Sequence, residues 1–193
     1  GRADFGVFQS DVSDLTRSYL PDSLQAKVQR VPGVEHTARF KLLVTDSGLL
    51  FGVDKDEFAV RRFVMLSGRR PTGSHDALVG DHTKRPVGSV VISNGERFPV
   101  IGIFHSGDKF LDNAVVLPIA AVQAASHRPG EITTIGVTVK PGWTPRAVAK
   151  AIERRFAGVT AVTEPGQAVK VDTSSRLIIS TGWIVSLLAL IVG

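Results

Sequence analysis

The side chains of this chain best suited to catalysis or metal binding are those of its five histidines and a few neighbouring carboxylates. The histidines are His36, His75, His82, His105 and His127. Asp76 directly follows His75, and Asp81 directly precedes His82, so each pair could supply metal ligands. Neither pair belongs to a compact helix or loop signature of a metal site. We therefore interpret both pairs as solvated loop residues beside turn glycines, with metal binding as the alternative.

A second candidate is the carboxylate pair Asp108 and Asp112, which could face each other across a short loop. A loop of Ser, Gly, Asp and Lys before a strand explains both residues without catalysis. The chain has no cysteine, which excludes a thiolate zinc finger, a Cys nucleophile and a CxxC redox site. It also has no GxSxG elbow and no GxxxxGK[ST] phosphate loop. We expect no catalytic residue, metal or cofactor; a hydrolase whose Ser, His and Asp meet only on folding is the remaining enzymatic alternative.

The formal net charge of +5 raises the question of a polyanionic partner. The basic residues form four separate pairs: Arg61-Arg62, Arg69-Arg70, Lys84-Arg85 and Arg154-Arg155. Aromatic residues do not alternate with them, so we expect no nucleic-acid surface. Anionic lipid headgroups are a simpler partner for these residues, and ordinary solvated faces are the alternative.

The C-terminal 17 residues, Leu177 to Gly193, contain no charged side chain. A helix needs roughly 20 apolar residues to cross a bilayer, with about 17 as the lower limit. We interpret this run as the start of a transmembrane helix in contact with the lipid bilayer; a buried core helix is the alternative. The residues expected to span the membrane are Leu177, Ile178, Ile179, Trp183, Ile184, Val185, Leu187, Leu188, Leu190, Ile191 and Val192.

The elements around these residues predict an α+β fold with two strand–helix–strand units. The first consists of a strand at 5–8, a helix from Pro21 to the Pro32-Gly33 stop, and a strand at 38–44. The second consists of a strand at 135–139, a helix begun by Thr144-Pro145 and ended by Gly158, and a strand at 159–162. We expect the two units to form one subdomain from residues 1–45 and 114–170.

The segment 46–113 between them is predicted to be an inserted β-rich subdomain. Its main signal is Asn94-Gly95, which predicts a hairpin between strands at 87–93 and 97–104. A short strand at 114–117 and a helix at 119–125 follow it. Residues 171–193 are expected to form a stalk and the start of the transmembrane helix.

Several short motifs, in their order along the chain, resemble one known family. They are Val31-Pro32-Gly33-Val34, Gly68-Arg69 with Pro71, Ala77-Leu78-Val79-Gly80, Val87-Gly88 followed by the run from Gly95 to Ile103, Asp112 to Pro118, and Val137 to Gly142. The apolar run from Leu177 resembles the start of the family's second transmembrane helix. In this pattern the chain is similar to the extracytoplasmic core domain of MacB/FtsX-like, type VII ABC transporter permeases. One departure is Ser89, which replaces the usual Asp after Val87-Gly88.

This resemblance implies a permease subunit without an ATP site of its own. It further implies a porter-like first subdomain, a sabre-like inserted subdomain, and a location on the extracytoplasmic side of the cell membrane. The implied partners are a cytoplasmic ABC ATPase and a second permease subunit, as a homodimer or a heterodimer. ATP-driven motion would reach the domain by mechanotransmission. The alternative is a membrane-anchored binding module of the cell envelope with no part in transport.

Overall fold

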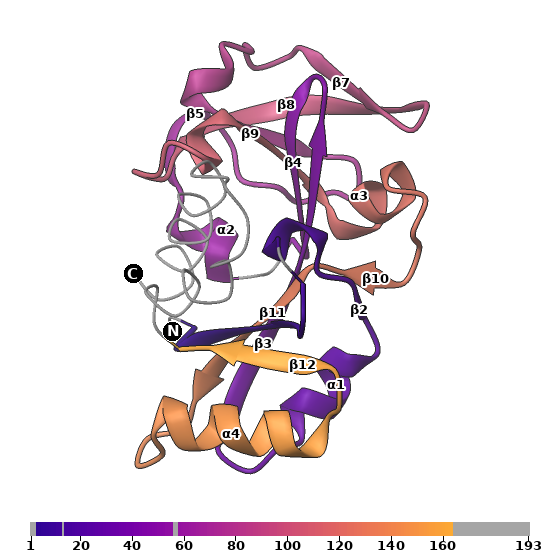
Figure 1. Cartoon of the computed structure of the whole chain (residues 1–193). Helices are drawn as coiled ribbons and strands as arrows, with labels where there is room; N and C mark the ends of the chain where they lie inside the picture. The colour runs from indigo at the N-terminus through magenta and orange to yellow at the C-terminus, as the bar shows by residue number, and fades with distance from the viewer. Residues whose placement is uncertain (1–2, 13, 56–57, 164–193) are drawn as a thin grey trace. The chain divides into compact units, whose positions relative to one another are not determined.

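The computed structural model describes residues 3–12, 14–55 and 58–163. These residues have a mixed α+β fold with extensive strand pairing and few helices (Figure 1). The chain divides into two compact units. Unit 1 takes its described residues from Gly1–Arg39 and Gly130–Gly193, and unit 2 is Phe40–Pro129. The strand β3 (Val34–Thr45) runs from the first unit into the second.

Unit 1 contains paired strands in the order β12-β1-β11-β3. The strands are β1 (Phe5–Gln9), β11 (Thr134–Val139), β12 (Val159–Val162) and the first part of β3. β1 pairs antiparallel with both β11 and β12, so chain segments more than 120 residues apart lie side by side. A separate two-stranded sheet joins β2 (Leu20–Pro21) to β10 (Glu131–Ile132).

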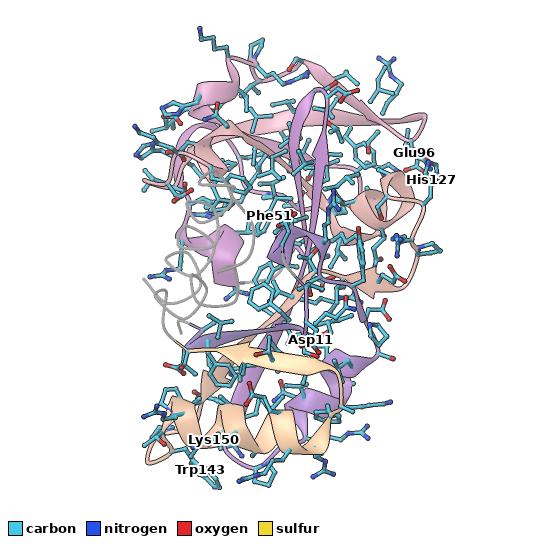
Figure 2. The ribbon with its side chains drawn as sticks, viewed as in Figure 1. Asp11, Phe51, Glu96, His127, Trp143 and Lys150 are labelled. Carbon is cyan, nitrogen blue, oxygen red and sulfur yellow. The ribbon has the colours of Figure 1, made fainter. Side chains whose placement is uncertain are left out.

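The helices of unit 1 are η1 (Leu15–Arg17), α1 (Leu24–Gln29) and α4 (Pro145–Arg155). The α4 helix begins as its sequence predicts: Pro145 is at its first position, and the Thr144 side chain accepts a hydrogen bond from Ala147 N. Val148 and Ile152 are buried on its inner face, and α4 packs against β12. Lys150 is an exposed residue of α4 (Figure 2).

The α1 helix is shorter than the sequence predicts. Pro21 was expected in the first helical turn, but Leu20–Pro21 is a strand and the helix begins at Leu24. The physical reason is a long-range pairing, because Leu20 is opposite Ile132 in the register of β2 and β10. The hydrophobic pattern within residues 20–31 cannot predict a strand partner more than 100 residues away.

Unit 2 is built on strands in the order β3-β4-β9-β6-β8-β5, with β7 paired to β8. The remaining strands are β4 (Gly48–Val53), β5 (Val64–Gly68), β6 (Ala77–Gly80), β7 (Val90–Ser93), β8 (Glu96–His105) and β9 (Ala114–Pro118). The short helices are α2 (Phe58–Arg62), α3 (Ile119–Ala125), η2 (Asp81–Thr83) and η3 (Leu111–Asn113). β4 pairs parallel with β9, and β6 pairs parallel with β8.

These pairings give unit boundaries that differ from the expected subdomains. The sequence predicts residues 40–45 and 114–129 to belong to the first subdomain, but both lie in unit 2. Residues 40–45 of β3 pair with β4, and β9 lies between β4 and β6. The α3 helix then packs on β4 and β9. Strand pairing therefore places both segments with the inserted part of the chain.

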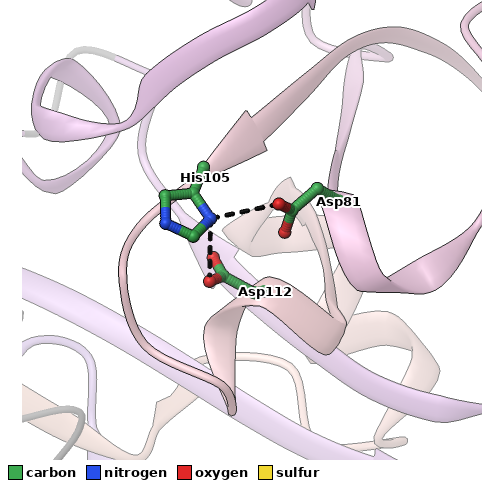
Figure 3. Close-up of side chains that lie close together, drawn as sticks. All are labelled: Asp81, His105 and Asp112. Carbon is green, nitrogen blue, oxygen red and sulfur yellow. Dashed lines mark hydrogen bonds and ion pairs between the residues drawn. The ribbon is translucent and has the colours of Figure 1, made fainter.

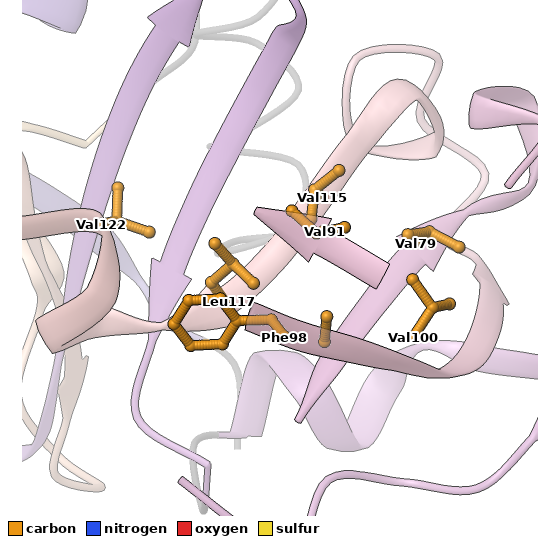
Figure 4. Packing of buried hydrophobic residues seen from close by; sticks show 8 residues of the cluster. Val79, Val91, Phe98, Val100, Val115, Leu117 and Val122 are labelled. Atoms are coloured by element: carbon orange, nitrogen blue, oxygen red, sulfur yellow. The ribbon is translucent and has the colours of Figure 1, made fainter. Parts of the chain in front are cut away.

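The core of unit 2 consists mainly of β-branched side chains from neighbouring strands. Its buried members are Ala77, Val79, Val91, Phe98, Val100, Val115, Leu117 and Val122 (Figure 4). Phe51, which is fully buried, stacks on Phe40 with ring centroids 5.6 Å apart (Figure 2). Alternation along β8 brings Phe98, Val100 and Phe104 to buried positions.

The β7–β8 hairpin agrees with its sequence prediction. Asn94 has φ of +48° and Gly95 has φ of +79°, the two positive values that a type I′ turn requires. The register pairs Ser93 with Glu96, which leaves those two residues as the loop.

Within the part of the chain that is described, no helix is both long enough and apolar enough to span a bilayer. The expected membrane-spanning run from Leu177 lies outside the described residues, as does the expected stalk.

Candidate functional site

Three polar side chains meet where strands of unit 2 begin and end. β6 and β8 are parallel, and Gly80 is opposite Phe104 in their register. Asp81 follows the last residue of β6, and His105 is the last residue of β8, so the two side chains emerge at the same end of the sheet. Asp112, in η3, precedes β9, which runs antiparallel to β6 and begins at this end.

The resulting Asp81–His105–Asp112 cluster is centred on one imidazole nitrogen (Figure 3). His105 Nδ1 is 3.1 Å from Asp81 Oδ2 and 3.2 Å from Asp112 Oδ2. The Asp112 side chain is only 2% exposed, whereas those of Asp81 and His105 are 25% and 45% exposed. The cluster therefore has a buried floor and a rim that solvent reaches.

The short loop before β9 holds Asp112 in position. Asp112 Oδ1 accepts hydrogen bonds from the Ser106 backbone N–H and the Ser106 hydroxyl, each at 2.7 Å. The Asp112 N–H donates to the Asp108 carbonyl at 2.8 Å. These contacts occupy Oδ1 and leave Oδ2 directed at His105.

Gly80 allows β6 to approach this loop closely. A Cβ atom on Gly80 would lie 2.3 Å from the Asp112 carbonyl oxygen, so only glycine leaves room for the η3 backbone here. This close approach brings Asp81 beside Asp112.

The cluster can act in two ways. The imidazole can share its Nδ1–H between the two carboxylates. These hydrogen bonds link the ends of β6 and β8 to the segment before β9. Alternatively, one nitrogen and two carboxylate oxygens can serve as ligands to a cation. Among the described residues, no lysine or arginine forms an ion pair with Asp81 or Asp112.

The other histidine and carboxylate candidates are separate. His75 lies 4.0 Å from Glu96 and stacks on Phe98, and His82 is exposed in η2. Asp108 Oδ1 accepts from the N–H groups of Phe110 and Leu111, whereas Asp112 Oδ1 accepts from Ser106, so the two carboxylates have different partners and do not form a pair.

The sequence places the three cluster residues in separate segments, and no local pattern connects them. Two signals were available: the predicted strand at 97–104 ends just before His105, and the predicted strand at 114–117 begins just after Asp112. The missing information was the parallel pairing of Ala77–Gly80 with β8. That pairing joins segments across an intervening hairpin, and local patterns do not encode it.

A second polar cluster organises the loop after β5. Arg69 Nη1 and Nη2 donate to Asp76 Oδ2 and Oδ1 at 2.9 and 3.2 Å. The N–H groups of Thr72 and Gly73 also donate to Asp76 Oδ2. Burial alone would raise the pKa of Asp76, but the hydrogen bonds from Arg69, Thr72 and Gly73 and the Arg69 charge together lower this pKa to about 2. The ionised carboxylate therefore holds the loop closed.

We expect Asp76→Asn to destabilise the chain by about 2 kcal/mol at pH 7, which corresponds to the lowering of the Asp76 pKa. The folded-state pKa of about 2 lies below that of the unfolded chain, so this stabilisation is complete above about pH 5 and is lost as the pH falls toward 2. Urea unfolding at pH 7 and pH 3 measures the difference. Asp46→Asn, at an exposed turn, is the control. A wild-type–Asp76→Asn difference that is equal at both pH values would contradict the assignment.

Comparison with known proteins places this fold in a family. The family model for the MacB-like periplasmic core domain matches residues 2–155. The chain belongs to this MacB-like family. The resemblance inferred from the short motifs is therefore confirmed, as an extracytoplasmic domain of the MacB/FtsX-like, type VII ABC transporter class.

Two solved structures have the same fold. One is the periplasmic region of MacB from Actinobacillus actinomycetemcomitans, with 16% identity, a TM-score of 0.64, and coverage of 89% of this chain and 94% of that one. The other is the extracellular domain of the noncanonic ABC-type transporter YknZ from Gram-positive bacteria, with 14% identity, a TM-score of 0.59, and coverage of 82% and 98%. A search among curated protein sequences found no match. At these identities the likeness concerns the fold of the MacB-like domain.

Proposed function

We propose that this MacB-like domain is the extracytoplasmic part of an ABC transporter permease subunit. It couples the ATP-driven motion of a cytoplasmic ATPase to export, or to the handling of a substrate outside the membrane. The observation that carries this proposal is the family match over residues 2–155, because it includes all of unit 2 and most of the described part of unit 1. The chain itself would have no catalytic role, and ATP would be hydrolysed by the partner subunit.

The connection between the two units supports a role in transmitting motion. The chain passes between them at Arg39–Phe40, inside β3, and again at Pro129–Gly130. In unit 1 the His36 N–H donates to the Thr138 hydroxyl on β11, and in unit 2 β3 pairs with β4. A strand hydrogen-bonded at both ends is suited to carry a displacement from one unit to the other.

Within this proposal, unit 1 corresponds to the porter-like subdomain and unit 2 to the sabre-like subdomain. Residues 171–193 form the stalk and the start of the second transmembrane helix, which brings the motion to unit 1. The domain lies on the extracytoplasmic side of the cell membrane. Its partners are the cytoplasmic ABC ATPase and a second permease subunit.

A doubly labelled permease tests this transmission. Because this chain contains no cysteine, every thiol in it would be an introduced one. Lys150→Cys with Ile92→Cys places one spin label on each unit, at two exposed positions. Lys150→Cys with Lys27→Cys places both labels on unit 1 and is the matched control.

In the full-length permease with its ATPase, ATP binding is expected to change the distance between the labels on the two units by several ångströms. The distance within unit 1 is expected to stay constant. Double electron–electron resonance measures both. Constant distances for both pairs while the complex hydrolyses ATP would rule out relative motion of the two units as the coupling step.

The alternative function is a membrane-anchored binding module of the cell envelope. Copurification separates the two: a permease subunit brings a nucleotide-binding subunit with it, whereas an anchored module does not.

A further inference from the structure

We propose that Asp81, His105 and Asp112 bind a divalent transition-metal cation. Their ligand atoms, one imidazole nitrogen and two carboxylate oxygens, all lie within 4.8 Å of one another. They come from three separate segments that the sheet brings to one end, so the cluster is a product of the tertiary fold. This inference concerns unit 2 alone and does not depend on the proposed transport function.

The two distances from the imidazole nitrogen match those between ligands of one metal ion, and the three ligand atoms all lie within 4.8 Å of one another. With metal–ligand bonds of about 2.0–2.2 Å, neighbouring ligand atoms in octahedral or tetrahedral geometry are separated by roughly 2.8–3.6 Å. His105 Nδ1 lies 3.1 and 3.2 Å from the two carboxylate oxygens. The side chains can therefore receive an ion with small rotamer adjustments.

A buried oxygen within the cluster supplies independent support. Asp81 Oδ1 is shielded from solvent and has no hydrogen-bond partner among the described residues. A buried carboxylate oxygen without a partner is costly, since it has lost hydration without compensation. A hydrogen bond from His105 to Asp81 Oδ2 does not reduce this cost, because Oδ1 still has no partner among the described residues. A cation bound by the Asp81 carboxylate reduces it, because the positive charge interacts with both oxygens.

The surrounding groups suit a cation rather than an anion. Asp112 is almost fully buried, and Ser106 donates two hydrogen bonds to its Oδ1, an arrangement typical of the groups that orient a metal-binding carboxylate. Two carboxylates and a neutral imidazole carry a charge of −2, which a divalent ion balances. Nε2 of His105 points away from both carboxylates (Figure 3), so it can hold the ring proton while Nδ1 binds the metal.

The ligand set favours Zn²⁺ or Mn²⁺. One imidazole with two carboxylates provides borderline and hard donors, and the chain has no thiolate that would select a softer ion. Three protein ligands leave at least one position for water, and the exposed rim of the cluster allows exchange. Bound there, the ion would join β6, β8 and the segment before β9.

Calorimetric titration of the chelator-treated chain with Zn²⁺ tests the site. Wild type is expected to bind one Zn²⁺ per chain, and its Tm is expected to rise with the added metal. Asp81→Asn and His105→Gln are each expected to weaken binding at least tenfold and to lose most of the Tm rise. Both side chains are partly exposed, so these variants are suited to retain the fold. His75→Gln, at an exposed histidine outside the cluster, is the matched control and is expected to bind as wild type does.

Co²⁺ provides a second readout, since its visible absorption bands report ligation directly. Asp112→Asn should abolish these bands in any preparation that is still folded by circular dichroism. The proposal is overturned if wild type shows no saturable binding of Zn²⁺, Mn²⁺ or Co²⁺ in the millimolar range. Wild-type affinity in both Asp81→Asn and His105→Gln, or an equal loss in His75→Gln, also overturns it.

Discussion

Phe104→Ala is expected to destabilise the folded chain by about 3–5 kcal/mol, the usual loss for a fully buried phenylalanine. Phe104 is 0% exposed, and its ring stacks on that of Phe63 with centroids 4.0 Å apart. The substitution removes this ring pair and leaves a cavity beside β8, the strand that pairs with β5, β6 and β7. Because β8 pairs with three other strands, the loss of packing at Phe104 is expected to destabilise most of unit 2.

Urea denaturation of wild type and Phe104→Ala measures this difference in the free energy of unfolding. Ile92→Ala is the control: Ile92 lies on the same hairpin but is 66% exposed, so its loss is expected to stay below about 0.5 kcal/mol. A loss below about 1 kcal/mol for Phe104→Ala would show that this ring is not part of a well-packed core.

Gly68→Ala is expected to be the second severe substitution, with a loss of about 3 kcal/mol from two additive causes. Gly68 has φ of +76°, and a Cβ there would lie 2.1 Å from the Ile101 carbonyl oxygen. The same oxygen accepts a hydrogen bond from the Arg69 N–H, so the backbone cannot move away without losing a contact of the Arg69–Asp76 loop. Left-handed backbone alone costs a non-glycine residue about 1–2 kcal/mol.

Gly88→Ala separates the two causes. Gly88 also has a positive φ, of +89°, but a Cβ there meets nothing within 4 Å. Chemical denaturation of the two variants is expected to show a clearly larger loss for Gly68→Ala. Equal losses would mean that backbone conformation alone matters at both sites and that β5 yields to the added methyl group.

Elements defined by local signals were predictable from the sequence. Asn94-Gly95 predicted the hairpin, because few residue pairs adopt two consecutive positive φ values at low cost. Thr144-Pro145 predicted the start of α4 for a similarly local reason, since the cap and the fixed proline φ act within one turn. The predicted helix at 119–125 matches α3.

Elements defined by distant partners were not predictable in this way. Leu20–Pro21 is a strand only because Glu131–Ile132 lies beside it. Ala77–Gly80 is too short to show a period, and its place between β8 and β9 depends on a parallel pairing across the hairpin. The extent of unit 2 beyond 46–113 has the same cause, since β9 is held by β4 and β6.

The sequence by itself determined the α+β class, the turns and caps, and membership of the MacB-like family, because these depend on residue types at short spacing and on the order of short motifs. Only the tertiary structure decided that Asp81, His105 and Asp112 meet, that Arg69 closes a loop on Asp76, and that β3 joins two units. The physical reason is that strand pairing and close backbone approach, as at Gly80, contribute to the free energy of folding only when segments distant along the chain come together. The chemistry of this domain therefore lies in contacts that no single segment encodes.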